Sequence, residues 1–201
     1  MIQSLIEERV AELYEEFRIG ELGFDLFHRA KKMGVEVTPY SAYIEMKNAD
    51  LLWKYDQDAF SFYNPKRKCF QILFNDEPSR KTRMKFTIAH ELGHIVLNHL
   101  LEEGTGKNNR QKETEANNFA REFYMPQVIL FRQNILSVPK LVKVFGISED
   151  YAKVIIDRMK KRYYVTNGNI IFSNEEERIY AAFCRNEKER KVNYDSVDVG
   201  Q

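Results

Sequence analysis

The chain has 201 residues, with 31 basic and 30 acidic side chains and a formal net charge of +1. This length suits one domain with appendages, and the balanced charge gives no electrostatic argument for a dedicated nucleic-acid binder. Cys69 and Cys184 form no CxxC pair, so neither a cysteine zinc site nor a disulfide scaffold is indicated. We expect a cytoplasmic protein without membrane spans, because no apolar run approaches about 18 residues and the acidic, amphipathic N-terminus is unlike a signal peptide.

Two helices are predicted in residues 1–34. Residues 2–17 carry apolar side chains at helical spacing and are followed by Gly20, and a second helix spans residues 21–33 before Gly34. We expect both helices to pack on the remainder of the protein, and a partner-binding helical hairpin is the alternative.

Three short strands are predicted next, at residues 35–38, 59–63 and 69–74, because these segments are rich in β-branched and aromatic residues. Residues 64–68 form a turn with a basic tip between the last two strands. The third strand leads directly into a helix, which residues 84–101 are predicted to form.

This helix contains the sequence His90-Glu91-Leu92-Gly93-His94, an HExxH motif. Two histidines four residues apart lie about 40° apart around a helix, so both imidazoles can hold one zinc ion. Zinc activates water near neutral pH, and Glu91 is placed to take a proton from that water. The pattern indicates a metal-dependent amide hydrolase.

A chance match, or a histidine pair that is merely buried and hydrogen-bonded, is the alternative interpretation. Apolar residues surround the motif on all sides, which is typical of a core helix; they are Phe86, Ile88, Ala89, Leu92, Ile95, Val96, Leu97 and Leu101. Burying two histidines and a glutamate there is costly unless a partner satisfies them, and a metal ion would do so.

A third ligand is predicted in a second helix, beginning near Glu113 after the polar loop 102–112. Glu113 and Asn117 are four residues apart on the face of the apolar positions Ala116, Phe119, Ala120 and Phe123. Glu115 is the rival ligand, but the helical wheel turns it about 160° away, towards solvent. His99 is nine residues from His90, which places it on the wrong face of a continuing helix.

The two segments FTIAHELGHIVLNH and ETEANNFAREFYMP resemble the ImmA/IrrE family of zinc metallopeptidases, over about residues 35–162. The resemblance implies a gluzincin-like site with one zinc ion per chain, held by His90, His94 and Glu113, with Glu91 as general base. The Glu113–Asn117 spacing is similar to the ExxxD of thermolysin-like peptidases, which implies that Asn117 supports a ligand from the outer shell.

The same resemblance implies a substrate and a way of holding it. Known members cleave or inactivate transcriptional repressors, so the expected partner is a protein, a helix-turn-helix repressor. In thermolysin-like folds an edge strand before the motif helix pairs with the substrate backbone, which assigns substrate binding to Phe70, Ile72 and Phe74. An internal strand without a free edge is the alternative.

The C-terminal third is predicted to be mainly helical. Residues 138–145 and 148–162 form two helices with Ser148 as a cap, similar to a helix-turn-helix, but acidic residues interrupt its basic face and direct nucleic-acid binding is not favoured. An Asn-Gly at 167–168 predicts a hairpin over residues 163–172. Ser173 and Glu176 predict a capping box for a last helix, followed from about residue 186 by a charged, disordered tail.

These patterns predict an α+β fold, in which a small antiparallel or mixed sheet packs on the HExxH helix and a second ligand helix. The predicted segments are 1–34 (N-terminal helices), 35–136 (metallopeptidase core), 137–162 (helix-turn-helix-like subdomain) and 163–201 (hairpin, helix and tail). The predicted function is zinc-dependent endopeptidase. A non-catalytic protein that binds a repressor or DNA through the helical subdomain is the alternative.

Overall fold

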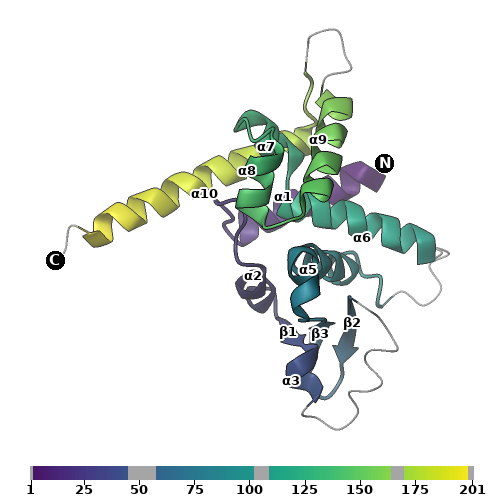
Figure 1. Cartoon of the computed structure of the whole chain (residues 1–201). Helices are drawn as coiled ribbons and strands as arrows, with labels where there is room; N and C mark the ends of the chain where they lie inside the picture. The colour runs from purple at the N-terminus through teal and green to yellow at the C-terminus, as the bar shows by residue number, and fades with distance from the viewer. Residues whose placement is uncertain (1, 45–57, 102–108, 164–169, 199–201) are drawn as a thin grey trace. The chain divides into compact units, whose positions relative to one another are not determined.

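The computed structural model describes residues 2–44, 58–101, 109–163 and 170–198 (Figure 1). Helices and one three-stranded mixed sheet make up its regular structure, which confirms the α+β class. The chain divides into two compact units. The sheet unit is Asp25–Tyr124, and the helical unit combines Met1–Phe24 with Met125–Gln201. The cut after Phe24 falls within the predicted N-terminal segment 1–34, between its two helices.

The predicted helices and strands occur in the predicted order, and three further short helices were not predicted. The sheet unit contains α2 (Leu26–Lys32), β1 (Val35–Pro39), α3 (Tyr40–Ile44), β2 (Ala59–Asn64), β3 (Cys69–Phe74), the 3₁₀ helix η1 (Pro78–Arg80), α5 (Lys81–Val96) and α6 (Asn109–Tyr124). The helical unit contains α1 (Ile2–Glu16), α7 (Gln127–Arg132), α8 (Val138–Phe145), α9 (Glu149–Tyr163) and α10 (Asn174–Asp198).

The sheet has the strand order β1-β3-β2, with β1 parallel and β2 antiparallel to β3. β3 is therefore the central strand and has no free edge for a substrate backbone. The prediction that Phe70, Ile72 and Phe74 bind substrate by edge pairing is wrong, because both sides of this strand are already used in the sheet. Among the described residues, β2 pairs on one side only, with β3.

α5 lies between the sheet and α6, and contacts both (Figure 1). The face of the sheet that carries Ile72 also carries its cross-strand neighbour Ser61, whose hydroxyl reaches α5. On the opposite face, Phe60 and Phe62 pack against the buried Tyr40 and Leu73. One face of the sheet thus packs against α5, and the other face packs against Tyr40.

Gly93 lets α5 and α6 approach closely. A Cβ atom at this position would lie 3.0 Å from the Phe119 ring and 3.1 Å from the backbone of Ala116. Ala116, Phe119, Ala120 and Phe123 are all fully buried, which confirms the predicted inner face of α6. Any larger residue at 93 would push α6 away from the histidines of α5.

Buried polar contacts join the helices of the helical unit. Arg162 of α9 pairs with Glu7 of α1 and, at 3.0 Å, with Glu176 of α10. Ser173 donates to Glu7 and Tyr163 donates to Glu176. Both carboxylates are 3% exposed, so these partners offset the cost of burying their charge.

Several end points differ from the predicted ones. α6 begins at Asn109, so the last residues of the predicted loop 102–112 are helical. α10 continues to Asp198, and the prediction of a disordered tail from residue 186 is therefore wrong. The centre of the predicted hairpin, residues 164–169, lies outside the described residues. Within the described ranges, no helix is both long enough and apolar enough to cross a membrane.

Two predicted caps are confirmed by their hydrogen bonds. The Tyr151 amide donates to the Ser148 hydroxyl at the start of α9, at 3.3 Å. At the start of α10, the Glu176 amide donates to the Ser173 hydroxyl and the Ser173 amide donates to the Glu176 carboxylate, at 3.1 and 2.9 Å. These reciprocal bonds are a capping box.

Candidate metal centre

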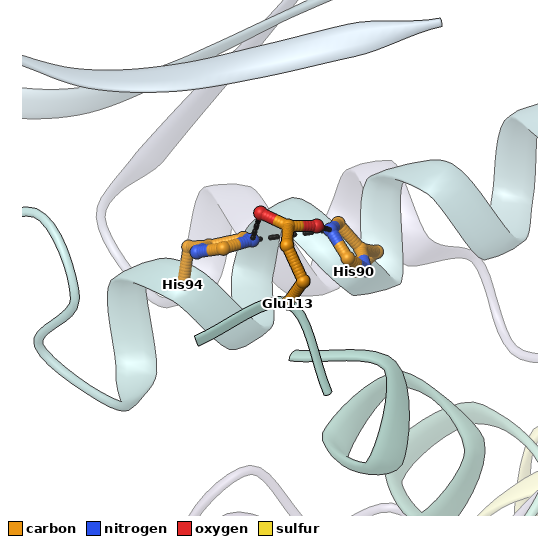
Figure 2. A group of neighbouring side chains, drawn as sticks. All are labelled: His90, His94 and Glu113. Carbon is orange, nitrogen blue, oxygen red and sulfur yellow. Dashed lines mark hydrogen bonds and ion pairs between the residues drawn. The ribbon is translucent and has the colours of Figure 1, made fainter. Parts of the chain in front are cut away.

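The predicted ligands His90, His94 and Glu113 meet between α5 and α6. The two histidines lie one turn apart on α5, and Glu113 extends from α6 so that its carboxylate stands between the two rings (Figure 2). The short distance between the helices at Gly93 brings the carboxylate within reach. The structure therefore places together three side chains that lie 23 residues apart at their extremes.

The distances among these side chains fit one small metal ion. The Nε2 atoms of His90 and His94 are 3.1 Å apart, and they lie 3.2 and 3.3 Å from the two carboxylate oxygens of Glu113. A tetrahedral zinc with bonds of about 2.0–2.2 Å separates its ligand atoms by about 3.3–3.6 Å. Two imidazoles and one carboxylate are also one of the known protein ligand sets of catalytic zinc.

The protonation state of His94 suits a metal ligand. Burial, followed by the nearby His90, His99 and Lys112, lowers the pKa of His94 to about 3. The imidazole is therefore neutral at physiological pH, so one of its two ring nitrogens has a lone pair available to a metal ion. Glu113, by contrast, is 56% exposed, which leaves one side of the site open to solvent.

Asn117 orients His90 from the opposite side of its ring. The Asn117 side-chain amide donates to the backbone carbonyl of Glu113 at 2.9 Å, which turns its Oδ1 towards His90 Nδ1 at 3.2 Å. Because Oδ1 can only accept, His90 carries its proton on Nδ1 and leaves Nε2 free for a metal. Asn117 lies where the sequence predicted a supporting residue.

Glu91 is buried next to the ligands and is held by β2. The Ser61 hydroxyl donates to Glu91 Oε2 at 2.6 Å. This hydrogen bond holds the carboxyl group in one orientation. Sequence reasoning missed Ser61, because period-two alternation shows only that it shares a face with Ala59 and Tyr63, and not which helix that face meets.

The prediction for Glu115 is wrong in its burial. Glu115 is buried and Glu113 is exposed, whereas the helical wheel turned Glu115 towards solvent. The reason is His99, whose Nε2 lies 3.0 Å from a carboxylate oxygen of Glu115 and draws this side chain inward.

The predicted orientation of His99 is also wrong, because α5 does not continue to it, although His99 is not one of the three grouped candidate ligands. The helix ends at Val96, and Asn98 has a φ of +59°, so the chain turns and brings His99 Nδ1 within 3.2 Å of His94 Nδ1. Asn is among the residues that most readily adopt this left-handed conformation at a helix C-terminus. Asn98 was therefore the signal in the sequence that the helix ends before His99.

Comparison with known protein families gives one match to a family model. The model of the IrrE N-terminal-like domain, Peptidase_M78, matches residues 30–154, which is more than half of the chain. The match includes α5, α6 and all three candidate ligands. No curated protein matches the chain. This match shows that the protein belongs to the Peptidase_M78 family of IrrE N-terminal-like domains.

Proposed function

We propose that this protein is a zinc-dependent endopeptidase whose substrate is another protein, a helix-turn-helix transcriptional repressor. The observation that supports this proposal is the convergence of His90, His94 and Glu113, with Glu91 held beside them. Membership of a peptidase family agrees with a hydrolytic site. A repressor substrate also implies that the protein acts in the cytoplasm.

The side chains of the site have distinct roles in this proposal. His90, His94 and Glu113 would hold the zinc ion, which supplies Lewis-acid polarisation of the scissile carbonyl and lowers the pKa of water. Glu91 takes the proton of the attacking water and passes it to the leaving amine. Ser61 keeps the Glu91 carboxylate oriented, and Asn117 keeps the proton of His90 on Nδ1.

The proposal is tested with the purified chain loaded with zinc. A cell lysate is incubated with the protein, and new protein N-termini are identified by labelling and mass spectrometry. We expect about one zinc ion per chain and new N-termini in a few proteins, DNA-binding repressors among them. A chelator should abolish these N-termini and added zinc should restore them. The absence of any chelator-sensitive N-terminus, from a chain that does hold zinc, would leave a binding protein as the function.

Ser61→Ala is predicted to slow catalysis without releasing the metal. It removes a hydrogen bond to a charged group, which is worth about 1.5–3 kcal/mol, and corresponds to a rate loss of about 10- to 100-fold. We expect kcat to fall while KM and zinc content stay at their wild-type values. Ser61→Thr retains the hydroxyl on a strand that tolerates β-branching, and should restore most of the rate. Equal rates for Ala and Thr variants would exclude this role of the hydroxyl.

A further inference from the structure

The strongest unassigned feature is a line of three side chains behind the candidate metal centre. His94 Nδ1 lies 3.2 Å from His99 Nδ1, and His99 Nε2 lies 3.0 Å from Glu115 Oε2. The side chains of His99 and Glu115 are only 1% and 7% exposed. A buried carboxylate and a buried imidazole are costly unless they are paired, and here each is the partner of the other, directly behind the candidate ligand His94.

We propose that Glu115 and His99 set the tautomer of His94, and thereby hold its Nε2 lone pair towards the metal. This inference rests on the proposed zinc site. Glu115 and His99 are positioning residues in this scheme, since they touch neither the metal nor a substrate.

The direction of each hydrogen bond follows from the groups at the two ends. The Glu115 carboxylate can only accept, so in this scheme the single proton of the His99 ring lies on Nε2 and is donated to Glu115. His99 Nδ1 then has a lone pair and accepts from His94 Nδ1–H. His94 Nε2 is therefore unprotonated, and it is the atom that lies 3.3 Å from Glu113 and 3.1 Å from His90 Nε2.

The backbone holds His99 where this chain of bonds needs it. The His99 amide donates to the His94 carbonyl at 2.9 Å, which keeps the two residues adjacent after α5 has ended. From α6, the Lys112 ammonium donates to the His99 carbonyl, also at 2.9 Å. α6 thus provides the candidate ligand Glu113, the supporting residue Glu115 and, through Lys112, an anchor for His99 after the end of α5.

The two histidine ligands consequently have different supports. His90 donates to the neutral amide of Asn117, whereas His94 donates to an imidazole that is itself backed by a carboxylate. A carboxylate behind a ligand raises the basicity of that ligand, and loss of such a partner typically lowers metal affinity about 10- to 100-fold. The inference therefore predicts that Glu115 matters for zinc affinity although it is not a ligand.

The test compares two buried carboxylates of the same helix. Zinc affinity is measured by competition with a chromophoric chelator for wild type, Glu115→Leu, His99→Leu and the double variant, with Glu122→Leu as the matched control. Glu122 is also buried on α6. We expect a loss of about 10- to 100-fold for either single variant at positions 115 and 99, no further loss in the double variant, and the wild-type value for Glu122→Leu.

A second measurement reads the protons directly. Two-bond ¹H–¹⁵N spectra of the full-length wild-type chain should show His99 with its proton on Nε2, before and after zinc is added. His94 should show its proton on Nδ1 in the zinc-loaded chain. A proton on His99 Nδ1 would overturn the inference, and so would equal affinities of Glu115→Leu and Glu122→Leu. This spectrum decides the matter alone if the Glu115 variant does not fold.

The zinc titration of wild type separates this inference from the proposed function. A wild-type chain that binds no zinc refutes the metal centre, and the inference fails together with it. A wild-type chain that binds zinc, with affinity indifferent to positions 99 and 115, refutes the inference alone.

Discussion

Glu113→Ala and His94→Ala are expected to remove the metal from the purified protein. Structural zinc sites with four ligands bind with about 10–16 kcal/mol, or about 2.5–4 kcal/mol for each ligand if the energy is shared equally. Loss of one ligand should then weaken zinc about 10²- to 10³-fold. Elemental analysis after dialysis should show about one zinc ion per wild-type chain and a strongly reduced content in both variants.

The control for this prediction is the second carboxylate of α6. Glu115→Ala should lose less affinity than Glu113→Ala, because Glu115 lies behind His99 and Glu113 faces both Nε2 atoms. Retained zinc in Glu113→Ala together with lost zinc in Glu115→Ala would make Glu115 the ligand. Thermal unfolding with and without zinc gives an independent check, because an ion that binds only the folded chain raises the unfolding temperature.

The fold was predictable where periodicity is strong and turn residues are in place. The three strands were located from their β-branched and aromatic residues, and α8 and α9 from helical spacing and the cap at Ser148. Strand order was not predictable, because no pattern in residues 69–74 indicates that β1 pairs parallel to β3, on the side of β3 that β2 does not use. The substrate-binding prediction for Phe70, Ile72 and Phe74 failed for this reason.

The C-terminal end of the chain was misjudged for a similar cause. Residues after 186 are highly charged, which by composition favours disorder. Asn186, however, is buried and donates to the carbonyls of Tyr14 and Ile19, and Gly20 allows the backbones to approach so closely that a Cβ atom would lie 2.3 Å from the Glu187 nitrogen. These contacts join residues more than 160 positions apart, and local composition cannot reveal them.

The parts of the candidate site that lie within a single helix were predictable, and the contacts between elements were not. Spacing within α5 identified His90, Glu91 and His94, and spacing within α6 related Glu113 to Asn117. The roles of His99 and Ser61 depend on the end of α5 and on contact with β2, which are tertiary features.

Glu91→Gln is expected to abolish peptide hydrolysis while leaving the metal in place. The amide has the shape of the carboxylate and its oxygen can still accept from Ser61, but it cannot take a proton from water. Removing a general base costs about 10²- to 10⁴-fold in rate. The measurement is the cleavage rate of a substrate identified from the lysate, for wild type and variant at equal zinc content.

This substitution also separates the two classes of function. A catalyst loses its effect on the substrate in Glu91→Gln although substrate binding and zinc are retained, whereas a protein that acts by binding alone retains its effect. A variant that cleaves at the wild-type rate would show that the proton is taken elsewhere. Because Glu91 lies between the two histidines but points to Ser61 on β2, its loss tests the chemistry of the site without removing any group that holds the metal.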